Sequence, residues 1–369
     1  MCDTVTSLFL FIVLSCTPAY TETKNCTDCI PYKSCDAAVE AIKKNDPAID
    51  TQLTNAFCGF EAGRPMVCCS DLTGLRQLEH SADNHPNLSL LPDDCGVGGE
   101  DFADRLAGAF PVPGLYEYPW MVLIGYKSSK PEEGPQFNCG GTLINDRYVL
   151  TAAHCIFSRG RSKLLSVRIG EYDVDTTTDC IGDKCESYVQ DIDIEEGIAH
   201  PEKKLVYPIK NDIGLIRLND TVNFSKNAGT ICLPVTRYLR TQDIDNLSAT
   251  VSHWRYSEGG YAFSKMLYAD VKINNAQQCK EQYDKITTNK NAREDNMLNK
   301  ICGSYPSGSD TCPVAGSPMM VQSLFGDRYR FVQYGVASYG PSHCGTLSLP
   351  EIYTDVTKYM MWILDTIRP

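Results

Sequence analysis

Hydrophobic and polar positions divide the chain into stretches of different character. An unbroken apolar run covers residues 7–14, and a polar stretch with no sustained period covers residues 70–94. Short β-rich runs between turn residues, such as residues 115–124 and 166–172, are typical of an all-β barrel protein. Near the end, apolar positions recur at helical spacing between Tyr353 and Ile367, which predicts a helix packed on a core.

The apolar run at the start is too short to span a bilayer and is followed by small residues around Ala19. We therefore interpret residues 1–20 as a secretory signal peptide, although this segment carries Asp3 and no lysine or arginine. The competing interpretation is a buried N-terminal strand. The cysteine content favours secretion.

Composition narrows the classes of partner. The chain has 369 residues, enough for one large domain and a small module, and its 43% hydrophobic content is ordinary for a globular protein. A formal net charge of −12 argues against nucleic acid or an anionic membrane surface as the main partner.

Cysteine usage points to an oxidising compartment. Of 18 cysteines, Cys2 and Cys16 lie in the presumed signal, and the sixteen that remain form an even set, as a disulfide framework requires. Five Asn-x-Ser/Thr sequences fit the secretory route and are candidate glycosylation sites. They begin at Asn25, Asn87, Asn219, Asn223 and Asn246.

Six of these cysteines lie within residues 26–69. The Cys-x-x-Cys at 26–29 could indicate a zinc or redox site, but no second Cys/His pair stands at ligand spacing. Disulfides are favoured because a module of this size has too little core to fold without them.

Three motifs together resemble the chymotrypsin-like serine proteases. The sequence around His154 reads Leu-Thr-Ala-Ala-His-Cys, the sequence around Asp212 reads Asn-Asp-Ile-Gly-Leu, and Cys139 begins Cys-Gly-Gly-Thr-Leu. In that family a serine hydroxyl attacks the substrate carbonyl, the histidine takes its proton and the aspartate orients the histidine. The cysteines of residues 26–69 in turn resemble the clip domain of arthropod serine proteases.

The resemblance implies a fold and a domain order. We expect an all-β, chymotrypsin-like double six-stranded β-barrel with a C-terminal helix, preceded by a small disulfide-rich clip domain at 26–69. A linker and activation segment would cover 70–105, with cleavage between Arg105 and Leu106, and the protease-like domain would cover 106–369.

The nucleophile motif of the family departs most from its pattern here. Relatives read Cys-x-Gly-Asp-Ser-Gly-Gly-Pro, whereas Cys312 begins Cys-Pro-Val-Ala-Gly-Ser-Pro, one residue shorter. Counting from Cys312, the nucleophile position is Gly316, and Ala315 replaces the aspartate that receives the new N-terminus in active relatives. Ser317 as a displaced nucleophile is disfavoured because Pro318 restricts its backbone. His154 and Asp212 then have no hydroxyl to activate.

The residues expected to form the specificity pocket match the trypsin-like pattern only in part. Asp310 stands where trypsin-like relatives place the carboxylate that receives Arg or Lys, and Ser338 and Gly340 match the entrance strand. A wall glycine of the family is Glu351 here. Its side chain either fills the cavity and repels the nearby carboxylate, raising a pKa, or it turns outward.

The resemblance also implies eight disulfides and permits a metal site. Glu171 lies in an acidic loop that could bind calcium, although no spaced ligand signature supports it and no other cofactor is expected. The implied pairs are Cys26–Cys68, Cys29–Cys58, Cys35–Cys69, Cys95–Cys232, Cys139–Cys155, Cys180–Cys185, Cys279–Cys302 and Cys312–Cys344.

The function that follows is that of a secreted, non-catalytic clip-domain serine protease homologue. Such a protein would regulate melanisation or Toll-type signalling in haemolymph by binding cascade proteases, prophenoloxidase or microbial surfaces, after a trypsin-like protease cuts at Arg105. Two alternatives remain: an active trypsin-like endopeptidase of the same cascade, favoured by His154, Asp212 and Asp310, and a microbial-surface binding module in the clip domain.

Overall fold

The chain forms two compact units, Met1–Ser81 and Ala82–Pro369. The computed structural model describes residues 26, 28–31, 34–35, 38, 56–61, 64–72, 82–99, 109–111, 113–128, 134–157, 163–206, 209–255, 263–286, 297, 299–306, 313–340 and 349–369. The presumed signal peptide and the cleavage site at Arg105 and Leu106 lie outside these residues. No helix among the described residues is both long and apolar enough to cross a membrane.

The first unit contains a small antiparallel sheet held by cystines. Its strands β1 (Cys29–Pro31), β2 (Phe57–Glu61) and β3 (Arg64–Cys68) lie in the order β1-β3-β2, and the helix α3 (Cys69–Leu72) follows directly. Its disulfides join Cys26 to Cys68, Cys29 to Cys58, and Cys35 to Cys69. Cystine sulfur thus supplies much of the interior of this unit, as expected for a module with a small core.

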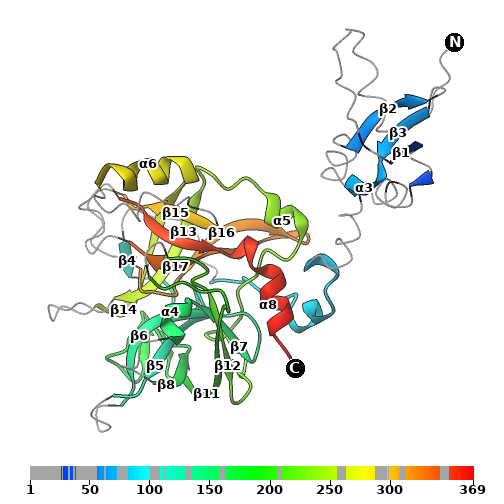
Figure 1. Cartoon of the computed structure of the whole chain (residues 1–369). Coiled ribbons are helices and arrows are strands. Elements are labelled where there is room, and N and C mark those ends of the chain that lie inside the picture. Colours follow the sequence, from blue (N-terminus) through cyan, green and yellow to red (C-terminus); the bar gives the residue numbers. More distant parts are fainter. Residues whose placement is uncertain are drawn as a thin grey trace. The chain divides into compact units, whose positions relative to one another are not determined.

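The second unit begins with a closed barrel, drawn in green in Figure 1. The strand order is β11-β12-β7-β6-β5-β8, and β8 pairs with β11 to close it. Its strands are β5 (Met121–Tyr126), β6 (Gln136–Leu143), β7 (Tyr148–Thr151), β8 (Leu164–Ile169), β11 (Gln190–Ala199) and β12 (Gly214–Leu218). The short β-rich runs at residues 115–124 and 166–172 therefore contribute strands to a barrel, as predicted.

A second barrel follows in the chain, drawn from yellow to red in Figure 1. Its sheet runs β13-β16-β17-β18-β15-β14, the β13–β14 pairing closes it, and β4 (Ala109–Pro111) adds to β14. Its strands are β13 (Ser248–Arg255), β14 (Phe263–Asn274), β15 (Lys300–Ser304), β16 (Pro318–Phe325), β17 (Arg328–Tyr339) and β18 (Glu351–Asp355).

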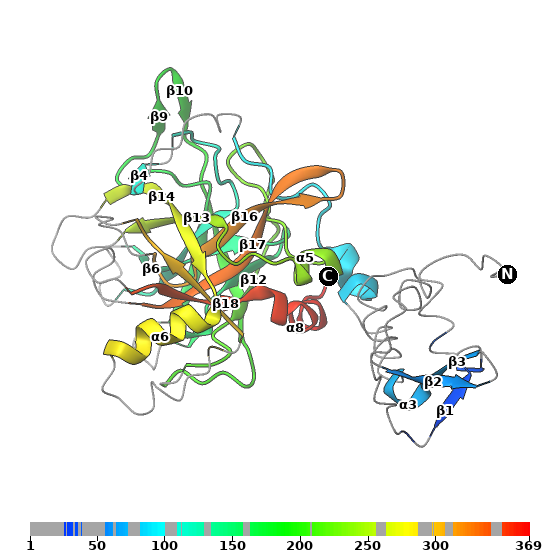
Figure 2. The same cartoon turned by 90° about the horizontal axis from the view of Figure 1, so that it is seen from above.

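The second unit also contains a small hairpin and several helices outside the barrel strands. Figure 2 shows the hairpin β9–β10 projecting from the body of this unit, with the disulfide Cys180–Cys185 across its two strands. The bounds are β9 (Asp179–Ile181), β10 (Lys184–Glu186), α4 (Ala153–Ile156), α5 (Arg237–Thr241), α6 (Ala276–Ile286) and α8 (Met360–Thr366).

The two barrels share a packed interface. The indole of Trp120, from the first barrel, lies 5.5 Å from the ring of Phe331 on β17, centroid to centroid. Beside them, the buried hydroxyl of Thr142 on β6 donates a 2.6 Å hydrogen bond to Oε1 of Gln333 on β17. Because buried polar groups lose free energy without a partner, this bond fixes the register of the barrels.

The C-terminal helix is shorter than the periodic pattern predicts. Residues 353–355 belong to β18, which pairs with β15 and β17, and a single 3-10 turn, η6 (Val356–Lys358), precedes α8. Tyr353 is completely buried in the strand. The apolar residues at 353–356 fit a buried strand as well as a helix. Their pairing with β15 and β17 places residues 353–355 in a strand.

Part of the segment expected to be a linker belongs to the second unit. The turns η3 (Ala82–Asn84) and η4 (Pro86–Leu90) belong to the second unit, and Leu88, Leu90 and Leu91 pack against its core. These leucines are spaced without a sustained period, so the pattern gave no sign of a packed element. The expected linker is thus interrupted by an anchor at residues 82–91.

Asn87 fastens this anchor to the C-terminal helix. Its side-chain amide donates to the carbonyl of Leu364 at 2.8 Å and to that of Ile367 at 2.9 Å, and so caps α8. A glycan on the same nitrogen would disrupt this pair of bonds. Asn219, Asn223 and Asn246 are exposed and remain candidate acceptors, whereas Asn25 lies outside the described residues.

Four further disulfides lie in the second unit. They are Cys95–Cys232, Cys139–Cys155, Cys180–Cys185 and Cys279–Cys302. With the three of the first unit, these are seven of the eight pairs that the resemblance implies. The eighth, Cys312–Cys344, lies outside the described residues.

Candidate active site

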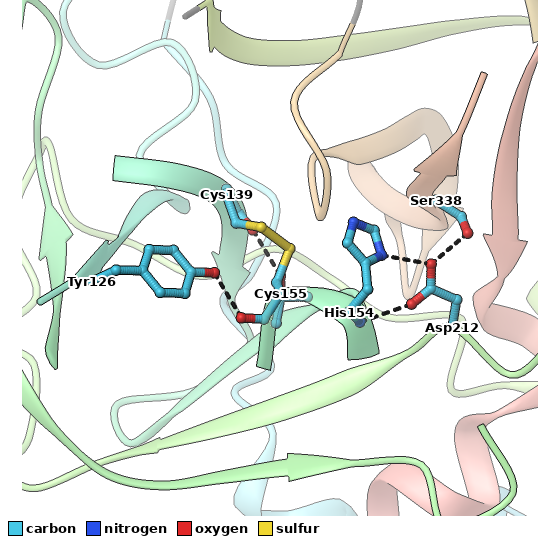
Figure 3. The surroundings of a disulfide bond; sticks show 8 residues. Tyr126, Cys139, His154, Cys155, Asp212 and Ser338 are labelled. Carbon is cyan, nitrogen blue, oxygen red and sulfur yellow. Dashed lines mark hydrogen bonds and ion pairs between the residues drawn. A yellow bond between two sulfur atoms is a disulfide. The ribbon is translucent and has the colours of Figure 1, made fainter. Parts of the chain in front are cut away.

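His154 is held in place by the short helix α4. Its neighbour Cys155 is bonded to Cys139 on β6, and the carbonyl of Cys155 accepts a 2.7 Å hydrogen bond from the hydroxyl of Tyr126 on β5. A helix of one turn has little stability of its own. The disulfide and the tyrosine therefore supply the rigidity that positions the imidazole, as Figure 3 shows.

Asp212 lies in the connection between β11 and β12, next to the left-handed residue Asn211 (φ 51°). The side chain of Asn211 supports this conformation: its amide donates to the carbonyl of Glu202 at 2.9 Å, and its oxygen accepts from the hydroxyl of Tyr359 at 2.7 Å. The backbone strain at a non-glycine residue is thus offset by bonds that aim the next side chain at the site.

The carboxylate of Asp212 is saturated with donors. One oxygen accepts from Nδ1 of His154 at 2.8 Å and from Oγ of Ser338 at 2.5 Å, and the other accepts from the backbone N–H of His154 at 3.0 Å (Figure 3). The hydroxyl of Thr354 donates to its main-chain oxygen at 2.8 Å. Burial at 2% exposure works to raise the pKa of Asp212, but the His154 and Ser338 bonds outweigh it and lower that pKa.

This geometry leaves an acid–base pair ready for use. An ionised Asp212 accepts from Nδ1, so Nδ1 carries the proton of the neutral ring and Nε2 is left as the acceptor. The side chain of His154 is 34% exposed, so solvent or a ligand can reach the ring. What the pair can do depends on whether a hydroxyl stands beside Nε2.

The bend that would carry the hydroxyl is a tight turn at residues 314–317. The N–H of Ser317 donates to the carbonyl of Val314 at 3.0 Å, and Gly316 has φ +84°, which fits the third position of a type II turn. The N–H of Gly140 donates to the carbonyl of Ala315 at 2.9 Å, which fixes the bend beside Cys139.

Gly316 leaves no room for a side chain. A Cβ at this residue would overlap the carbonyl oxygen of Gly140 and the hydroxyl of Thr151. Counting from Cys312 gives residue 316 as the nucleophile position, but the backbone does not allow a serine there. Ala315, the preceding residue of the turn, is half-buried and packs against the hydrophobic core.

Ser317 does not replace the missing group. It is completely buried, its Oγ makes no hydrogen bond within the described residues, and the nearest approach to β6 is at Gly140. Its carbonyl accepts from the N–H of Ala337 at 2.8 Å, so the residue is already the start of the β16–β17 ladder. Pro318 begins β16 directly after it.

Glu351 turns into the pocket that Ser338 and Gly340 border. Its side chain is only 5% exposed, and a Cβ at Gly340 would overlap its carboxylate. Burial raises the pKa of Glu351 to about 8. A group of this size against the entrance strand removes space that a substrate side chain would need. Asp310 lies outside the described residues.

Two family profiles match this chain. The trypsin family profile matches residues 112–363, and that of the regulatory CLIP domain of proteinases matches residues 20–69. CLIP domain-containing serine protease B4 of Anopheles gambiae is 35% identical over 92% of this chain and 89% of the relative. Phenoloxidase-activating factor 1 of Holotrichia diomphalia is 33% identical over 92% and 91%.

The chain belongs to the clip-domain family of trypsin-like serine proteases. The crystal structure of the Drosophila Grass clip serine protease of the Toll pathway has a TM-score of 0.62 at 28% identity, covering 93% of this chain and 97% of that one. The expected chymotrypsin-like fold of two six-stranded barrels with a C-terminal helix and a clip domain is therefore confirmed.

One loop of this clip-domain protein was a candidate calcium site. Glu171 is buried, but one of its oxygens accepts from the N–H of Tyr172 at 3.0 Å and the other from Arg168 at 3.3 Å. Burial and the neighbouring Asp179 raise the pKa of Glu171. Among the described residues, Glu171 joins no group of three ligands close enough to share an ion. A guanidinium thus occupies one side of the carboxylate.

Motif reading missed the supporting contacts of this protease-like site. Ser338 was assigned only to the pocket entrance, yet its hydroxyl is bonded to Asp212, and Thr354 holds the main chain of Asp212 from β18. A Tyr-Thr pair in a family motif marks Thr354, but its partner is visible only in three dimensions.

Proposed function

We propose that this chain is a secreted, non-catalytic clip-domain serine protease homologue that regulates an extracellular immune protease cascade by binding other proteins. The turn at residues 314–317 carries this proposal: Gly316 has no room for a side chain, Ala315 lacks a hydroxyl, and the hydroxyl of Ser317 is buried. The buried Glu351 supports it, because it occupies the pocket that would receive a substrate side chain.

The cascade is inferred from the names of relatives. Phenoloxidase-activating factors 1 and 3 of Holotrichia diomphalia, Spaetzle-processing enzyme of Drosophila melanogaster and Grass carry names from melanisation and Toll signalling. We assign this chain to the same kind of haemolymph cascade, with cascade proteases or prophenoloxidase as partners and a trypsin-like protease cutting after Arg105. The same proposal includes secretion by means of the signal peptide, a chain held by disulfides, and no required cofactor.

An active trypsin-like endopeptidase remains the second candidate. The intact His154–Asp212 pair favours it, since an acid–base pair with this geometry is what a nucleophile would require. The third interpretation, a microbial-surface module, has no described residue that favours it over the first.

The proposal predicts an effect on the cascade that does not need His154. Wild-type protein, cleaved after Arg105, and its His154→Ala variant are added to prophenoloxidase and an active clip protease. Phenoloxidase activity should change by the same factor with either protein, because the effect depends on binding surfaces and does not require the imidazole of His154. A change that only the wild type produces would favour the endopeptidase.

A further inference from the structure

The loop that leads from β11 to Asp212 holds an unusual arrangement of lysines. Lys204 and Lys210 lie directly opposite each other in an antiparallel bridge, joined by two backbone hydrogen bonds of 2.9 Å, and both side chains are exposed. Like charges at directly opposed positions destabilise a ladder. The bridge therefore concentrates positive charge at some cost to local stability.

These charges are not neutralised within the described residues. Neither Lys204 nor Lys210 forms an ion pair there, and the half-buried Lys203 places its ammonium 4.6 Å above the ring of Phe157 instead of on a carboxylate. The whole chain has a net charge of −12. A basic patch on such a protein is a local feature and attracts acidic groups selectively.

Apolar side chains accompany the lysines. Phe157, which follows α4 and is 59% exposed, and Val206, which is 53% exposed in the same loop as the lysines, are among the large hydrophobic residues that the structure leaves open to solvent. A surface that combines separate ammonium groups with apolar contacts suits a peptide chain better than a uniformly charged polymer.

A cavity of about 120 Å³ opens beside Lys210. Lys300 lines it as well, with its ammonium 3.1 Å from the hydroxyl of Tyr339, so two lysine side chains border the cavity. Asp212 also borders it, but both carboxylate oxygens are already bonded to His154 or Ser338. The remaining chemistry suits a carboxylate.

We propose that Lys203, Lys204 and Lys210, together with Phe157 and Val206, form a docking surface for an acidic segment of a partner protein, with one carboxylate entering the cavity between Lys210 and Lys300. We call this set the lysine surface. It deepens the proposed function, on which it rests, because it names a surface and a partner chemistry for binding beside the acid–base pair.

The test uses the full chain and a fluorescein-labelled peptide of alternating glutamate and phenylalanine residues. Fluorescence anisotropy measures its affinity for the wild type and for the double variant Lys204→Glu/Lys210→Glu. We expect the double reversal to weaken binding about tenfold or more, and added salt to weaken wild-type binding, because charges at the rim of an interface are screened. The matched control is Lys226→Glu/Lys272→Glu, two exposed lysines elsewhere, which should leave the affinity unchanged.

Three results would overturn the lysine surface: equal weakening by both double variants, equal binding of a peptide with glutamine in place of glutamate, or binding of heparin but not of the acidic peptide. The last would assign the surface to polyanions. The readout does not involve catalysis. Failure of peptide binding therefore rejects the surface alone, whereas a functional nucleophile would reject the proposed function.

Discussion

Replacing Gly316 with serine, the change that motif counting suggests for restoring a protease, should destabilise the protein and restore no activity. The residue has φ +84°, and a Cβ would overlap Gly140 and Thr151. A left-handed conformation at a non-glycine residue costs about 1 kcal/mol, and overpacking adds 1–3 kcal/mol, so we expect a loss of about 3 kcal/mol in the free energy of unfolding. Chemical denaturation with the disulfides intact measures it.

Ala315→Ser is the matched control for this change. Ala315 is half-buried and does not have the positive φ of Gly316, so the variant should unfold within about 1 kcal/mol of the wild type. A Gly316→Ser variant that is as stable as the wild type and reacts with a fluorophosphonate would show that the turn holds its nucleophile at residue 316. The described backbone would then be wrong at this point.

Glu351 should make the protein less stable as the pH rises. Its pKa is about 8 in the folded chain, because burial opposes ionisation, against an ordinary value of 4.5. Below about pH 4.5 Glu351 does not reduce the free energy of unfolding. Between about pH 4.5 and 8 the free energy of unfolding falls, because the carboxyl group loses its proton more readily in the unfolded chain than in the folded one. At about 1.4 kcal/mol per unit of pKa, the wild type should lose about 5 kcal/mol relative to Glu351→Gln across this range.

Chemical denaturation of both proteins at several pH values measures this difference, and other titrating groups cancel because they occur in both. Parallel curves for the wild type and Glu351→Gln would contradict a buried, neutral carboxyl group. Glu351→Gly provides an independent readout, because it should open the pocket to p-aminobenzamidine, which the wild type should not bind. Equal binding of this ligand by both proteins would place the Glu351 side chain outside the pocket.

Short motifs predicted the parts of the site that depend on local chemistry. The residues around His154 and Asp212 specify an imidazole and a carboxylate, and the structure brings them to 2.8 Å. The short β-rich runs between turn residues predicted barrel strands, although β5, β7 and β12 are buried along their whole length and not on one face alone. These features depend on residues that are close together in the sequence, so the sequence alone is enough to predict them.

The features that the sequence did not predict depend on contacts between distant segments. The position of the turn relative to Gly140 decides that residue 316 has no space, and a count from Cys312 cannot include that contact. The direction of Glu351 depends on the strand carrying Gly340. The packing of Leu88 depends on α8, nearly the whole chain away. In each case a residue far away in the sequence determines where the side chain lies, and the spacing of residues along the chain does not identify that distant residue.

The most direct test of the missing nucleophile is covalent labelling. The full chain is cleaved after Arg105 and treated with a biotinylated fluorophosphonate beside its His154→Ala variant, with an active clip protease as the positive control. Loss of the nucleophile from such a triad lowers turnover by about 10⁶. We predict that the wild type labels no more than His154→Ala and hydrolyses an arginine ester no faster. Labelling that depends on His154 and maps to residues 313–318 would contradict a non-catalytic role.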